Sequence, residues 1–214
     1  MNARTTVQTT LPILPPLAAR SPILTERLLL RPLILSDVQA LHALRSQPEV
    51  MIWTRKGVPD SSLQETQVYL AERLGVQEDS FSGAICLRSN GEMIGIGGVP
   101  RMAGELGWPT IGYLFLKETW GKGYGTEFVR GFLQAWWSLE RANHEIEVDK
   151  STIGADGEGT KEIVIAGIIE GNAASENILR KTGFRFVRTW ETALRDNEPP
   201  MTIRDFAASQ QDLL

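Results

Sequence analysis

Three glycines separated by single residues, Gly121, Gly123 and Gly125, form the segment of this chain best suited to bind a phosphate group. They follow a short apolar run, 111–116, which has the length and composition of a β-strand. Apolar residues then recur at three- and four-residue spacing, which predicts a helix. A helix that begins after such a loop directs backbone N–H groups and the positive end of its dipole at an anion. Because Lys122 adds a full positive charge, we expect a phosphate-bearing ligand here.

Two common nucleotide-binding motifs do not fit this loop. The Walker pattern G-x-x-x-x-G-K-[ST] would need a glycine at Leu116 and a serine or threonine at Gly123. The dinucleotide pattern G-x-G-x-x-G would place its third glycine at Thr126. The spacing therefore excludes both.

The loop resembles the coenzyme A loop of the GNAT superfamily of N-acetyltransferases, whose pattern is Q/R-x-x-G-x-G/A. Residues 120–127 are W-G-K-G-Y-G-T-E, and tryptophan in place of the first Gln or Arg is similar to the RimJ/RimL-like branch. Three further segments resemble that branch in the same order: T-E-R-L-L-L-R at 25–31, G-E-M-I-G at 91–95, and N-A-A-S with L-R-K-T-G-F within 172–184. A single glycine loop is weak evidence, but four ordered segments within 23–190 are strong evidence for the family.

The resemblance implies that acetyl-CoA is the cosubstrate. The strand at 111–116 and a second strand near 163–169 would splay apart and hold the pantetheine arm between them, with contacts from Leu114, Phe115 and Leu116. The pyrophosphate would rest on the loop and the start of the helix, that is, on Gly121, Lys122, Gly123, Tyr124, Gly125 and Thr126.

The resemblance also implies catalytic roles. Asn172 would bind the cofactor arm or the intermediate, and Ser175 would protonate the departing thiolate, although a serine is equally suited to cap a helix there. Related sequences often carry a glutamate just before the I-G-Y strand, where this chain has Thr110. The nearest upstream carboxylate is Glu105, so either Glu105 acts through a water molecule or the acceptor amine needs no strong base.

The expected reaction is direct transfer of the acetyl group to a primary amine, on a peptide N-terminus or a small molecule, through a tetrahedral intermediate. An acyl-enzyme is not expected, because the only cysteine, Cys86, lies in an apolar strand-like run where a buried, inert thiol is favoured. The alternative is a CoA-binding regulatory protein without catalytic activity. The acceptor amine and the choice between monomer and homodimer stay open.

Composition excludes several other classes of function. With 22 basic and 26 acidic residues the net charge is −4, so no positive field favours nucleic acid. One cysteine and two histidines, His42 and His144, do not form a metal-binding pattern, and we expect no metal. No apolar run approaches the length of a membrane-spanning helix, which favours a cytoplasmic protein without a membrane partner.

The resemblance implies an α/β fold of the α+β type, with a central mixed, mostly antiparallel twisted sheet of about seven strands and four helices. No linker composition divides the chain, so we expect a single domain at 23–214. Residues 1–22 predict a flexible tail; they resemble a mitochondrial presequence in lacking acids, but their prolines disfavour its helix. Residues 142–162 predict an inserted surface loop, with a flap or a subunit contact as the alternative.

Local signals predict the elements that must position these residues. Ser36 with Gln39, and Ser62 with Glu65, form capping-box patterns that indicate the starts of two helices, the second ending at Gly75. Asn90-Gly91 predicts a hairpin turn. The remaining expected elements are strands at 27–33, 81–87, 93–99, 163–169, 184–188 and 201–206, and a helix from about 175 to 182.

Overall fold

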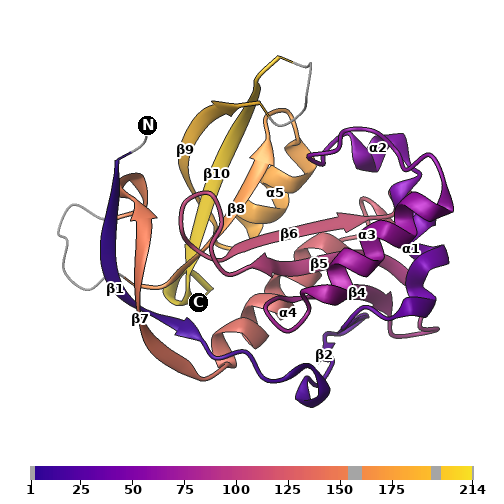
Figure 1. Ribbon diagram of the computed structural model, residues 1–214, viewed down its shortest axis with the longest axis horizontal. Coiled ribbons are helices and arrows are strands. Elements are labelled where there is room, and N and C mark those ends of the chain that lie inside the picture. The colour runs from indigo at the N-terminus through magenta and orange to yellow at the C-terminus, as the bar shows by residue number, and fades with distance from the viewer. Residues whose placement is uncertain (1–2, 154–160, 194–198, 214) are drawn as a thin grey trace.

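Eight strands form the main sheet of the computed structural model, which describes residues 3–153, 161–193 and 199–213 (Figure 1). Their order is β2-β3-β4-β5-β6-β8-β10-β9, and every neighbouring pair is antiparallel except β6 with β8. The predicted mixed, mostly antiparallel sheet is confirmed. Its strands are β2 (Ile23–Leu24), β3 (Leu28–Arg31), β4 (Phe81–Leu87), β5 (Met93–Arg101), β6 (Thr110–Phe115), β8 (Ile163–Ile169), β9 (Arg185–Thr192) and β10 (Met201–Ser209).

The parallel pair β6 and β8 is joined at one end only. Thr110 and Ile165 are their single register position, where the Pro109 carbonyl accepts a 2.9 Å hydrogen bond from the Ile165 N–H. Beyond this point the two strands diverge, and Figure 1 shows β8 turning away from β6. The sheet therefore contains an opening in the middle, as the splayed-strand prediction required.

Helices cover both faces of the sheet. On one face lie α1 (Val38–Arg45), α2 (Pro48–Met51) and α3 (Leu63–Gly75), which bury residues such as Leu41 and Leu70 against Ala84 and Cys86 of β4. On the other lie α4 (Tyr124–Ser138) and α5 (Ala173–Lys181), whose cluster includes Ile85. Alternate residues of β4 thus point to opposite cores, as the strand period of two requires. Short 3₁₀ helices occupy Leu17–Ala19, Leu35–Asp37, Lys117–Thr119, Lys150–Thr152 and Gln210–Leu213.

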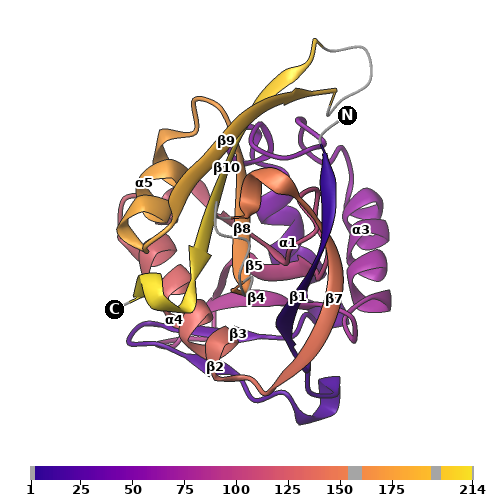
Figure 2. The ribbon, with the colours of Figure 1, turned by 90° about the vertical axis from the view of Figure 1, so that its left-hand side faces the viewer.

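The prediction of a flexible tail at 1–22 is wrong for most of its length. Strand β1 (Arg4–Pro12) pairs antiparallel with β7 (Arg141–Asp149) in a separate two-stranded sheet, which Figure 2 shows at the side of the molecule. Val7 and Leu11 are buried on one face of β1, and Val7 joins a cluster with Trp108. Pairing of backbone groups and burial of this face order the segment.

The inserted loop expected at 142–162 is corrected by the same strand pair. Its first part is β7, followed by a 3₁₀ turn, and its residues 154–160 lie outside the described part of the chain. Arg188 of β9 ties β7 to the main sheet, because it binds Asp149 at 2.7 Å and Asp205 of β10 at 3.2 Å. Residues 142–149 are therefore a paired strand with a fixed place in the fold.

The helix starts differ from prediction in two of three cases. The capping box at Ser36 is wrong: α1 begins at Val38, and Asp37 accepts from the Ile34 N–H at 2.9 Å while it binds Arg31. The cap at Ser62 is confirmed, with its hydroxyl accepting from the Glu65 N–H at 3.3 Å. The third helix, α5, begins at Ala173, two residues earlier than expected.

Candidate functional site

The glycine loop lies between β6 and α4 and holds two residues in left-handed backbone conformations. Gly121 has φ +73° and Gly123, the N-cap of α4, has φ +83°. Within the described part of the chain, the backbone N–H groups of residues 121–126 donate to no backbone or side-chain acceptor. The loop and the helix end thus offer a set of free donors beside the positive end of the α4 dipole.

Side chains from the chain segment before β3 hold this loop in place. The Glu127 carboxylate accepts from the Thr25 hydroxyl at 2.6 Å, from the Arg27 N–H at 2.7 Å and from Arg27 Nε at 2.7 Å. Arg27 also donates to the Lys122 carbonyl at 3.0 Å and lies 4.6 Å from the centre of the Tyr124 ring. Two of the four motif segments are therefore in direct contact.

The charge on Glu127 is stabilised by this contact. Burial acts to raise the pKa of its carboxyl, but the hydrogen bonds from Thr25 and Arg27 outweigh burial and hold that pKa below its ordinary value. Glu127 is therefore ionised at neutral pH, at the helix end where a negative charge is favoured.

Trp120 and Gly125 have structural explanations of their own. The Trp120 indole N–H donates to the Phe115 carbonyl at 2.8 Å, which closes the end of β6 against the loop. A Cβ atom at Gly125 would lie 2.5 Å from Cδ1 of Ile178, so this glycine allows α4 to pack closely on α5. Gly121 differs, because a Cβ there would meet nothing within 4 Å.

The edge of β6 that faces the opening is formed by Tyr113 and Phe115. The Leu116 N–H donates to the Ile94 carbonyl of β5 at 2.9 Å, and the antiparallel register places Leu114 opposite Ile96. Since backbone groups alternate along a strand, those of Leu114 and Leu116 face β5 and those of Tyr113 and Phe115 face β8. The side chains of Leu114 and Leu116 pack against the hydrophobic cluster on the α1–α3 side of the sheet.

Asn172 and Ser175 lie together at the start of α5. The Asn172 side-chain oxygen accepts from the Ser175 N–H at 3.1 Å, so Asn172 caps the helix. The capping role considered for Ser175 is thereby filled by its neighbour, and the Ser175 hydroxyl is not used for it.

Tyr113 is a site residue that the sequence interpretation did not single out. Its hydroxyl is buried and makes no hydrogen bond to the described residues. Burial raises the pKa of Tyr113 to about 12, and the side chain of Ser175 opposes that rise, which shows that the two hydroxyls are neighbours. A tyrosine inside an apolar strand was the available signal, but only the fold reveals its proximity to Ser175.

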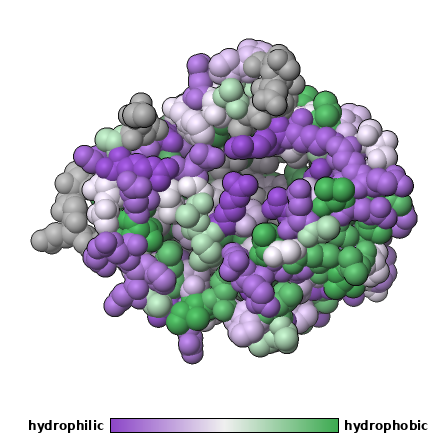
Figure 3. Space-filling model, in the orientation of Figure 1, coloured by the Kyte–Doolittle hydropathy of each residue, from purple (hydrophilic) through white to green (hydrophobic). Residues whose placement is uncertain are grey.

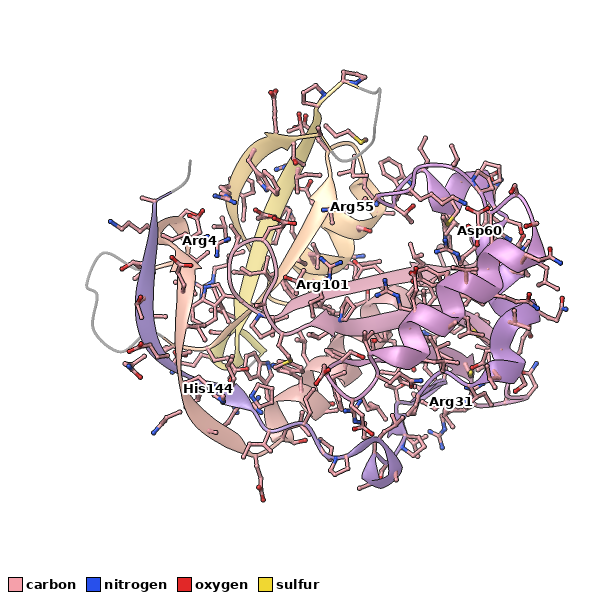
Figure 4. The ribbon with its side chains drawn as sticks, viewed as in Figure 1. Arg4, Arg31, Arg55, Asp60, Arg101 and His144 are labelled. Carbon is pink, nitrogen blue, oxygen red and sulfur yellow. The ribbon has the colours of Figure 1, made fainter. Side chains whose placement is uncertain are left out.

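Glu105 lies apart from this pair. It is exposed in the loop after β5, where its carboxylate is 3.5 Å from Arg55 Nη2 and its carbonyl accepts from Arg4 at 3.1 Å. Figure 4 shows Arg4 and Arg55 on either side of this loop. No hydrogen bond or ion pair among the described residues joins Glu105 to Asn172 or Ser175.

The opening beside β6 reaches the surface. Figure 3 shows a recess on this face, at the place where α2, α5 and β6 surround an open space in Figure 1, and most of its rim is hydrophilic. On the α3 side of the sheet a cavity of about 150 Å³ is lined by β6 residues that include Gly112 and Tyr113. A larger cavity of about 870 Å³ lies between β1, β7 and the end of α3, away from the glycine loop.

Among the described residues, neither Cys86 nor the residue types that bind metals form a second site. Burial raises the pKa of the Cys86 thiol, which keeps it protonated at neutral pH. In the described ranges no three His, Cys, Asp or Glu side chains are grouped so as to hold a metal ion. The helices of those ranges include none long and apolar enough to cross a membrane.

Comparison with known proteins gives consistent matches. Residues 27–185 match the family model of the acetyltransferase (GNAT) domain. The uncharacterized N-acetyltransferase p20 of Bacillus licheniformis is 30% identical over 107 residues, which are 50% of this chain and 60% of that protein. This chain therefore matches less than two thirds of the length of that curated relative.

Two solved structures share the fold at low sequence identity. A GNAT-family acetyltransferase from Bacillus anthracis has a TM-score of 0.68 at 20% identity, covering 89% of this chain and 99% of that one. RimL, the ribosomal L7/L12 α-N-protein acetyltransferase, in complex with coenzyme A, has a TM-score of 0.63 at 15% identity, covering 88% and 98%.

Proposed function

Since the chain belongs to the GNAT acetyltransferase family, we propose that it transfers the acetyl group of acetyl-CoA to a primary amine. The observation that carries this proposal is the row of N–H groups at 121–126 that have no acceptor among the described residues, beside the opening between β6 and β8. The W-G-K-G-Y-G-T-E segment and the RimL fold match favour the RimJ/RimL-like branch.

The residues present fit acetyl-CoA as a cosubstrate. The free N–H groups at 121–126 and the Lys122 ammonium would bind the pyrophosphate, which needs donors and positive charge. The backbone edge of Tyr113 and Phe115 would pair with the amides of the pantetheine arm, while Leu114 and Leu116 support that edge from the other side of the strand. Asn172 would contribute its amide N–H groups, because its oxygen is used in the cap.

The reaction requires two proton movements. The amine nitrogen bonds to the acetyl carbon and loses a proton, the carbon–sulfur bond breaks, and the sulfur takes up a proton. Ser175 would give that proton, and the neighbouring Tyr113 hydroxyl, which is protonated at neutral pH and whose pKa burial raises further, would be a second proton donor beside it.

The second proton movement is the removal of a proton from the acceptor amine. Glu105 remains a predicted base, and because it is exposed and separate from Ser175, it would act through water. An acceptor with a low-pKa amine, such as a peptide α-amino group near pKa 8, would need less assistance than a lysine amine.

The test is CoA release with a panel of amines that includes short peptides with different first residues and small-molecule amines. Acetyl-CoA-dependent release with at least one acceptor, together with a thermal shift by CoA, is the expected result. A thermal shift without release by any amine would favour the CoA-binding regulatory protein. The absence of any shift would contradict both functions.

A further inference from the structure

An arginine that forms no ion pair with any described residue lies on the α3 side of the sheet. Arg73 is in the last turn of α3, and its Nε is buried and makes no hydrogen bond to any described residue. Its guanidinium lies 4.9 Å from the centre of the Tyr69 ring. A buried donor that has no partner in the protein is unfavourable, and a bound ligand can supply the missing acceptor.

A second arginine on the same ring shows what a satisfied site looks like. Arg45 lies 3.7 Å from the centre of the Tyr69 ring and binds Asp60 through two hydrogen bonds of 2.6 and 2.9 Å. Arg73 lies between two cavities and also lines the larger one, together with the acids Glu72, Glu78 and Asp79, but it forms no ion pair with any of them. Arg45 thus has an ion-pair partner, whereas Arg73 has none among the described residues.

Arg73 and Tyr69 line the cavity of about 150 Å³ that is also lined by Gly112 and Tyr113 of β6. A Cβ atom at Gly112 would meet nothing within 4 Å, and Gly112 is not among the glycines with positive φ. Neither packing nor backbone conformation therefore requires glycine at this position. Its missing side chain leaves the cavity open next to Tyr113, the neighbour of Ser175.

We propose, on the basis of the acetyltransferase function above, that the acceptor is a small amine bearing a carboxylate, of the size of a free amino acid. Arg73 binds that carboxylate from α3, and the amine lies toward Tyr113. The planar guanidinium matches a carboxylate with two parallel hydrogen bonds. The cavity is smaller than the roughly 300–1,000 Å³ of typical ligand pockets, which favours a small acceptor over a protein segment.

The test compares amino acids with their carboxamides as acceptors, at matched concentrations of the neutral amine. The wild-type protein should prefer the carboxylates. Arg73→Met should raise KM for them about 10- to 100-fold, the size expected for lost hydrogen bonds to a charged group, and leave the carboxamides unaffected. Arg73→Lys should restore part of the affinity. Arg130→Met, which removes an exposed arginine on α4, is the matched charge control and should change neither class.

Two further measurements separate the possible failures. Arg73→Met should keep its thermal shift with CoA and should lower Tm only slightly, because it loses the ring contact with Tyr69 but no ion pair to a described residue. Gly112→Val should fill the cavity and weaken carboxylate acceptors while it also keeps the CoA shift. A wild-type preference for carboxamides, or an equal effect of Arg73→Met on both classes, would overturn the proposal while acetyl transfer itself stands.

If the wild type binds CoA but acetylates none of these amines, binding of N-acetyl amino acids to the CoA-saturated protein decides the question by calorimetry. Binding that Arg73→Met weakens supports the carboxylate site, and no binding refutes it. If the wild type does not bind CoA, the acetyltransferase function fails, and this inference fails with it.

Discussion

Gly121 and Gly91 form a matched pair that isolates the ligand-binding role of the glycine loop. Gly121 has φ +73° and Gly91 has φ +74°, and a Cβ added at either position meets nothing within 4 Å. Gly91 is in the β4–β5 turn, whereas Gly121 is in the loop before α4. A side chain at either position strains the backbone to the same degree, and its Cβ atom meets open space, so a difference in ligand binding between the two valine variants is assigned to the ligand.

The expected magnitudes follow from these geometries. A side chain held at positive φ destabilises a protein by about 1–3 kcal/mol, so Gly121→Val and Gly91→Val should each lower Tm by a few degrees. A side chain at Gly121 would also keep a phosphate from the loop donors. Loss of two charge-assisted hydrogen bonds of about 1.5 kcal/mol each weakens acetyl-CoA binding about 100-fold or more.

Calorimetric titration of both variants with acetyl-CoA provides the measurement. Gly91→Val should bind as the wild type does, and Gly121→Val should show little binding at the same concentrations. Wild-type affinity in Gly121→Val, or an equal loss in both variants, would refute the assignment of the loop as the pyrophosphate site.

Four further outcomes are expected. Ser175→Ala should lower kcat about 10²-fold with little change in Tm. Asn172→Ala should lose about 1 kcal/mol of stability, because it removes the cap of α5. A stability loss in Ser175→Ala without a fall in kcat, or an unchanged stability in Asn172→Ala, would reject these roles. Glu127 has a lowered folded pKa, so its stabilisation is present above its ordinary pKa of 4.5 and is lost as pH falls through the folded value. The Tm difference from Glu127→Gln should therefore shrink below that pH, and a constant difference would contradict this origin. Glu105→Gln should remove the limb of the pH–rate profile on which the rate rises with pH, if Glu105 accepts the proton in its ionised form, and an unchanged profile excludes it. Cys86→Ala should stay active, and an acetyl-Cys86 adduct formed during turnover would disprove direct transfer.

The central elements of the fold could be predicted because each has a strong local signal. Strand β8 occupies the predicted residues 163–169, since a β-branched apolar run has few alternatives to a buried strand. The Asn90-Gly91 turn and the apolar spacing of α4 are equally local. These signals depend only on residues close together in the sequence. The glycine loop at 121–126 could be recognised for the same reason, because its pattern is also local.

The missed features depend on contacts between distant parts of the chain. β1 is a strand because β7 supplies its hydrogen-bond partners. Val7 is buried because it packs in a cluster with Trp108. The cap of α5 is Asn172 instead of Ser175 because the chain enters the helix earlier than the residue types indicate. The burial of the Tyr113 hydroxyl, without a hydrogen bond to any described residue, can be seen only once the surrounding residues are placed.

The most direct test of the central claim is a crystal structure with coenzyme A bound. The pyrophosphate should lie within hydrogen-bond distance of the N–H groups at 121–126, with the pantetheine arm between β6 and β8 and its sulfur near Ser175. Coenzyme A bound elsewhere, for example in the larger cavity beside β1 and β7, with the 121–126 donors unused, would contradict the account.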